Sequence, residues 1–132
     1  GTLVFGTLHT NSATKTIDRL VDAFPANQQA QVRTTLADSI CAIVSQLLLP
    51  TSDGQGRCAA HEILLRTNSL PNIIREGNTT MLKSVIQSGV NEGMCAMDDS
   101  LEGLLKAGQI SAASAMAKAR DKSRFKNFTR PA

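Results

Sequence analysis

His9 is the residue whose type and position best suit chemistry. It follows a nearly unbroken apolar run at residues 3–8 and precedes three polar residues. Such a run is typical of a strand buried on both faces of a parallel sheet. Because ligands gather beyond the carboxyl ends of strands in such sheets, His9 is a candidate site residue. The alternative is that residues 10–12 only cap the next helix and that His9 lies in solvent.

Hydrophobic spacing downstream predicts two helices and a β-hairpin. An apolar stripe of Ile17, Leu20, Val21 and Phe24 marks the first helix, and Pro25 ends it and starts the second. The stripe of the second helix continues to Leu47, although residues 43–49 fit a strand equally well. Residues 50–56 read PTSDGQG and contain an Asp-Gly pair, so we expect a hairpin over residues 44–66.

The chain from residue 68 onward predicts a small helical bundle. Three short apolar stripes end at Gly77, Gly89 and Gly108, and glycine commonly terminates helices. Ser111 is placed to cap a last helix of small residues.

Composition narrows the function classes. The 132 residues are enough for one domain, and no stretch approaches the ~18 apolar residues of a membrane span. With four Phe and no Trp or Tyr, the chain lacks an aromatic stacking surface for single-stranded nucleic acid. The last fifteen residues hold six basic side chains against one acidic side chain. We expect this tail to be partly disordered and either solvated or bound to nucleic acid.

The cysteines and histidines do not predict a metal site. Cys41, Cys58 and Cys95 are widely spaced and form no Cys-x-x-Cys pair, so we expect buried, inert thiols. Cys58 and His61 would point to opposite faces of a strand. His61-Glu62 lacks a second histidine four residues on, and we expect it to serve packing at the hairpin.

Four separated motifs occur along the chain: GTLHTNSA at residues 6–13 with TIDR at 16–19, AHEI at 60–63, NIIRE at 72–76, and Gly93-Met94 followed by Asp98 and Leu101. In this order they resemble the motifs of the PilT-like type IV pilus retraction ATPases of the secretion ATPase superfamily. The resemblance runs from residue 1 to about residue 120. Pro71 departs from it, because the family has arginine there.

The resemblance implies an α/β fold. Residues 1–66 would be the C-terminal part of a RecA-like P-loop ATPase domain, with a strand, two helices and a hairpin. Residues 67–120 would form the helical bundle and residues 121–132 the basic tail. The phosphate-binding loop and the acidic Walker B segment are absent here, and we expect both before Gly1. Since phosphoryl transfer needs them, the chain alone would be inactive.

The resemblance also implies residue roles. His9 would be the catalytic residue near the terminal phosphate of the nucleotide, where imidazole can hydrogen-bond a phosphate oxygen or a water. Thr10 and Arg19 would contact the nucleotide; the alternatives are helix capping for Thr10 and ion pairs with Asp18 or Asp22 for Arg19. The segment Asn72, Ile73, Ile74, Arg75 and Glu76 would transmit mechanical output.

The implied parent is a homo-hexameric, cytoplasmic motor at the inner membrane. It would use ATP with Mg²⁺ to power pilus retraction and twitching motility, and would contact inner-membrane pilus platform proteins but no specific nucleic acid. The alternatives are a pilus-assembly or type II secretion ATPase, or a non-enzymatic module that binds nucleic acid through its basic tail.

Overall fold

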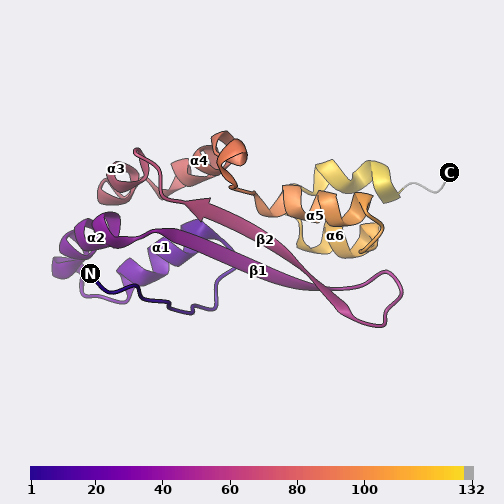
Figure 1. Cartoon of the computed structure of the whole chain (residues 1–132), viewed down its shortest axis with the longest axis horizontal. Coiled ribbons are helices and arrows are strands. Elements are labelled where there is room, and N and C mark those ends of the chain that lie inside the picture. Colours follow the sequence, from indigo (N-terminus) through magenta and orange to yellow (C-terminus); the bar gives the residue numbers. More distant parts are fainter. Residues whose placement is uncertain (130–132) are drawn as a thin grey trace.

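The computed structural model describes residues 1–129 as a long β-hairpin with helices packed around both of its ends (Figure 1). The hairpin consists of β1 (Ala42–Pro50) and β2 (Arg57–Leu65). At its open end lie α1 (Ala13–Asp22), α2 (Ala26–Ser39), α3 (Leu70–Arg75) and α4 (Leu82–Ser88). Toward its turn lie α5 (Met97–Lys106), α6 (Ala112–Lys118) and the 3-10 helix η3 (Lys122–Thr129). Two further 3-10 turns are η1 (Thr79–Met81) and η2 (Val90–Glu92).

The two strands pair antiparallel over nine residue pairs, from Ala42↔Leu65 to Pro50↔Arg57. On β1, Ile43, Ser45 and Leu49 are buried while the residues between them are mostly exposed, which is the period of two expected of a strand with one covered face. The predicted hairpin is therefore confirmed, and residues 43–49 form a strand. Gly54 has φ of +69°, so the Asp-Gly pair supplies the left-handed residue of the turn.

The predicted helices are present, although α2 ends at Ser39, before the end of the apolar stripe that runs on to Leu47. Ser12 caps α1 and Ser111 caps α6, each through a side-chain oxygen that accepts a backbone N–H three residues on. In α1, Ile17 and Val21 are buried, but Phe24 lies beyond the helix and is 44% exposed. Gly77 and Gly108 follow α3 and α5 with φ near +69°, a backbone conformation that favours glycine.

Two hydrophobic clusters stabilise the fold. The first joins α1, α2, α3 and α4 with the open end of the hairpin, through residues such as Ile17, Leu64 and Ile74. The second joins the turn half of the hairpin with α5, α6 and η3. Packing therefore groups α3 and α4 with α1 and α2. The predicted division between an ATPase-domain part at residues 1–66 and a helical bundle at residues 67–120 remains a proposal.

The predicted strand at residues 3–8 is wrong. These residues form neither helix nor strand, and Leu3, Val4 and Phe5 are 72%, 78% and 90% exposed. A central strand needs hydrogen-bonding partners on both sides, and within residues 1–129 β1 and β2 pair with each other, and β2 also bridges to Cys95 through Ile63, but neither strand pairs with residues 3–8.

The expected disorder of the tail is also wrong over most of its length. Residues 122–129 form η3, and the side chain of Phe125 is fully buried in the second cluster. The burial of one aromatic side chain therefore accompanies an ordered segment, although the residues around it are mostly polar. Residues 130–132, with Arg130, lie outside the described residues.

Candidate functional site

The loop that carries His9 is tied to the first turn of α1. The backbone N–H of Lys15 donates to Ser12 Oγ at 3.1 Å, and Thr16 Oγ1 donates to the carbonyl of Ser12 at 2.9 Å. The hydroxyls of Thr10 and Thr16 are 2.6 Å apart. These local bonds fix the direction in which residues 9–12, here called the histidine loop, enter the helix.

His9 opens onto a solvent-filled hollow of about 850 Å³ between the histidine loop and α1. Thr10 and Arg19 line the same hollow, so the structure brings together all three residues predicted to contact a nucleotide. Arg19 Nη1 lies 3.5 Å from the carbonyl oxygen of His9, and within residues 1–129 it forms no ion pair with Asp18 or Asp22.

Lys15 is a lining residue that the sequence analysis missed. It lies one turn before Arg19 on α1, so the two cations share a face and both border the hollow. The signal was available in the sequence as a Lys–Arg pair four residues apart just after His9. Asp18 and Asp22 also line the hollow and reduce its positive charge.

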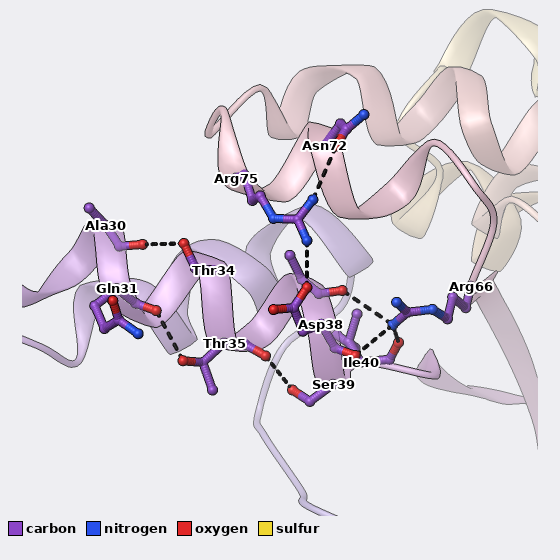
Figure 2. Close-up of polar contacts among 11 residues, drawn as sticks. Ala30, Gln31, Thr34, Thr35, Asp38, Ser39, Ile40, Arg66, Asn72 and Arg75 are labelled. Carbon is purple, nitrogen blue, oxygen red and sulfur yellow. Dashed lines mark hydrogen bonds and ion pairs between the residues drawn. The ribbon is translucent and has the colours of Figure 1, made fainter.

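The segment 72–76 lies elsewhere, on α3, where it packs against α2. Ile73 and Ile74 are buried while Arg75 and Glu76 are exposed. Figure 2 shows Arg75 reaching across to α2: Nη2 lies 2.5 Å from Asp38 Oδ1, and Nη1 donates to Asn72 Oδ1 at 3.1 Å. Pro71 occupies the first turn of α3, which proline tolerates.

A second arginine joins the same helix end. Arg66 Nη1, just after β2, donates to the carbonyls of Ala37, Asp38 and Ile40 at 3.2, 3.1 and 2.9 Å (Figure 2). These are carbonyls at the C-terminus of α2, where the helix dipole favours a positive charge. The end of α2 is therefore fixed to the hairpin by Arg66 and to α3 by Arg75.

His61 serves packing at the hairpin, as expected. Its backbone N–H donates to Ser100 Oγ at 3.0 Å, and its Nε2 lies 3.1 Å from Gln46 Oε1. Its neighbour Glu62 is almost fully buried and pairs with Arg120 at 2.7 Å, a contact that the sequence analysis did not predict.

The cysteines do not lie as expected. Cys41 is exposed rather than buried, and Cys58 and Cys95 are partly buried. Burial, with the nearby carboxylates of Asp99 and Glu62, raises the pKa of the Cys95 thiol, which lowers its reactivity. Within residues 1–129 no cluster of three His, Cys, Asp or Glu side chains could hold a metal ion.

Two basic side chains near the C-terminus, Arg120 and Arg124, form ion pairs within the chain. Arg124 pairs with Asp99 at 2.7 Å and with Glu102 at 2.5 Å, and Lys106 pairs with Glu102 at 2.6 Å. Hydrogen bonds from Lys106 and Arg124 hold the pKa of Glu102 below its ordinary value. This neutralisation reduces the charge that the tail can offer to nucleic acid.

The fold is that of the C-terminal part of the pilus-retraction and DotB class of ATPases. The solved structure of "the Pilus Retraction Motor PilT and Bound ADP" matches with a TM-score of 0.79 and 42% identity, over 92% of this chain and 34% of that one. The ATPase DotB of Legionella pneumophila matches with a TM-score of 0.66 and 24% identity, over 83% of this chain and 29% of that one, which shows the fold alone.

Among curated proteins, the "Twitching motility protein" of Neisseria gonorrhoeae is 48% identical over 92% of this chain. The "Type IV pilus retractation ATPase PilT" of Pseudomonas aeruginosa is 48% identical over 91%. The chain spans about a third of the length of these relatives, 32% and 35%. No protein-family model matches the sequence. The resemblance to the retraction ATPases is confirmed, and it covers their C-terminal part.

Proposed function

We propose that this chain works as the C-terminal part of a hexameric motor ATPase that powers type IV pilus retraction. The observation that carries the proposal is the exposed His9 on a fixed loop beside Lys15 and Arg19, in a chain 48% identical to two retraction proteins. A histidine and two cations around an open hollow suit the terminal phosphates of a nucleotide.

The residues of the hollow fit ATP only in part. Lys15 and Arg19 would neutralise phosphate charge, Thr10 would line the same face, and His9 would hydrogen-bond a phosphate oxygen or the attacking water. When bound, ATP supplies the phosphoryl group that is transferred to water. The phosphate-binding loop and the Mg²⁺ ligands would come from the part of the relatives' length that this chain does not span.

The chain alone should therefore not hydrolyse ATP. Phosphate release by the purified 132-residue protein is expected to equal that of a no-protein control. Release that stays above the control after repurification would contradict this expectation.

A chimera tests the catalytic role of His9. This chain would replace the matching C-terminal third of the gonococcal twitching motility protein, and His9→Ala would be introduced. We expect turnover to fall by roughly 100-fold, as for loss of one proton-transferring or charge-stabilising group, with nucleotide binding little changed. His61→Ala is the control for loss of a histidine, because within residues 1–129 the His61 side chain does not line the hollow and forms a hydrogen bond with only one of its lining residues, Gln46. Equal turnover of the His9 variant and the parent chimera would exclude His9 from the chemistry.

The same chimera tests mechanical coupling by residues 72–76. An Arg75→Ala, Glu76→Ala double variant should hydrolyse ATP normally and yet fail to restore twitching to a retraction-deficient strain. The reason is that output depends on a surface of α3 that moves against its neighbours, whereas turnover depends on the hollow. Normal twitching by the stable double variant would return α3 to an ordinary packing role.

The remaining parts of the proposal are the assembly and its setting. We propose a homo-hexamer in the cytoplasm that contacts inner-membrane pilus platform proteins. None of the helices within residues 1–129 is long and apolar enough to cross a membrane. A pilus-assembly or type II secretion ATPase is the alternative, and the retraction names of the two 48% identical relatives favour retraction. The nucleic-acid alternative has less support, because Arg120 and Arg124 are paired within the chain.

A further inference from the structure

A buried carboxylate lies where the hairpin meets the histidine loop. The side chain of Glu62 is 2% exposed, and its Oε1 accepts the backbone N–H of Ala13, the first residue of α1, at 2.8 Å. Its Oε2 lies 2.7 Å from Nη1 of Arg120. A carboxylate buried to this degree is stable only when its oxygens have partners, so Glu62 depends on both contacts.

Arg120 contacts the histidine loop directly as well. Its Nη2 donates to the carbonyl oxygen of Asn11, two residues after His9, at 3.0 Å. One guanidinium therefore joins the Glu62 carboxylate and the loop backbone at the same time. The planar, rigid arrangement of its donors makes arginine suited to this double contact, which a lysine cannot make in the same way.

The second hydrophobic cluster holds Arg120 in place. Asp98, only 8% exposed, accepts the backbone N–H groups of Arg120 and Asp121, each at 2.9 Å. Phe125, fully buried, anchors the segment that follows. The position of the Arg120 backbone is thus set by α5 and η3, at the opposite end of the molecule from α2 and α3 (Figure 1).

We propose that Glu62 and Arg120 are positioning residues for the histidine loop. Neither lines the hollow; they act from behind it, through Asn11 and Ala13, and make the C-terminal segment part of the site. The proposal deepens the proposed function, since the loop matters for turnover only if His9 does.

Hydrogen exchange on the full 132-residue chain tests the positioning itself. Arg120→Ala should raise the exchange rate of the Ala13 amide, which donates to Glu62, by about tenfold or more, while the hairpin stays protected. Arg124→Ala is the matched control, because Arg124 is another arginine of the same segment that pairs with carboxylates, Asp99 and Glu102, but contacts no residue of the loop. Arg120→Lys keeps the charge without the double contact and should give an intermediate exchange rate. This variant replaces Arg120→Ala in the test if Arg120→Ala does not fold. Unchanged exchange of the Ala13 amide in folded Arg120 variants, or an equal rise in Arg124→Ala, would overturn the proposal.

The chimera described above supplies the activity readout. Arg120→Ala should lower kcat by about tenfold with little change in the KM for ATP, because a displaced catalytic group affects turnover more than binding. If the unsubstituted chimera has no ATPase activity, the proposed function fails, while the exchange experiment still decides whether the loop is positioned. If the chimera is active and Arg120→Ala leaves kcat unchanged, the positioning proposal fails.

Discussion

Two arginine–carboxylate contacts of similar length lie in different surroundings. Arg120 and Glu62 are 2.7 Å apart, with side chains 46% and 2% exposed; Arg75 and Asp38 are 2.5 Å apart, with side chains 41% and 59% exposed, so the two contacts differ in the burial of the carboxylate. Water screens the second pair, and such pairs contribute about 0–1 kcal/mol. Removing the partner of a buried carboxylate leaves an uncompensated buried charge, and the resulting loss of stability is several times larger. The burial of the carboxylate, rather than the distance between the charged atoms, therefore decides which contact contributes more to stability.

The largest effect is expected from removing the anchor of the buried contact. Phe125→Ala should lower the free energy of unfolding by about 3–5 kcal/mol, because it leaves a cavity in the second cluster and releases the segment that carries Arg120. Urea unfolding followed by circular dichroism measures this. Phe128→Ala is the control, since Phe128 lies in the same 3-10 helix but is 44% exposed. Similar midpoints for the two variants would mean that η3 contributes little to the fold.

The same substitution in both contacts tests the comparison directly. Arg120→Ala should cost about 2–4 kcal/mol, since Glu62 stays buried with one partner fewer, and Arg75→Ala less than about 1 kcal/mol. Added salt should reduce the small contribution of Arg75 further, because exposed charges are screened. Equal losses of stability in the two variants would show that the environment does not decide the strength of the contact.

A smaller, pH-dependent effect is expected from the ion pairs that Glu102 of α5 forms with Lys106 and with Arg124 of η3. The pKa of Glu102 is lowered in the fold by Lys106 and Arg124. The stability that these contacts contribute is therefore present above the ordinary value of 4.5 and is lost as the pH falls through the lowered value. Glu102→Gln should make the free energy of unfolding fall less steeply below pH 4.5 than in the unsubstituted chain, in urea titrations at several pH values. Glu92→Gln, at an exposed glutamate of η2, should leave that slope unchanged, and an equal change there would refute the assignment.

The smallest effect is expected where a buried polar group has no partner to lose. The hydroxyl of Ser45, opposite Glu62 in the hairpin, is buried and unpartnered within residues 1–129. Ser45→Ala should change stability by no more than about 0.5 kcal/mol and in the stabilising direction, because it removes a desolvated group. Ser111→Ala, which removes the cap of α6, should cost about 1 kcal/mol in the same assay. A clear loss on Ser45→Ala would reveal a partner for its hydroxyl.

Features set by neighbours in sequence were predictable. The caps at Ser12 and Ser111 depend on contacts within one turn of chain. The grouping of His9, Thr10 and Arg19, which the family resemblance implied, also spans only about three turns. The hydrophobic pattern of residues 43–49 fitted a helix and a strand equally well, and it is pairing with β2 that makes this segment a strand.

Features set by distant partners were not predictable. The apolar run at residues 3–8 has strand composition but no partner strand within residues 1–129. Conversely, the polar and basic composition of the tail predicted disorder, although Phe125 is buried in the second cluster. Composition averaged over a segment does not show that one of its side chains is buried. The contact between Arg120 and Asn11 joins residues 109 positions apart, a separation over which no local pattern carries information.

That separation has a consequence for the order of events during synthesis. At about 5–20 residues per second, a ribosome makes Arg120 roughly 5–20 seconds after Asn11. Until then, Glu62 and the carbonyl of Asn11 lack the guanidinium of Arg120, and the histidine loop is held by the local hydrogen bonds of Ser12 and Thr16. During synthesis, the surroundings of the candidate catalytic histidine can therefore be completed only after the hairpin and the first four helices have been made.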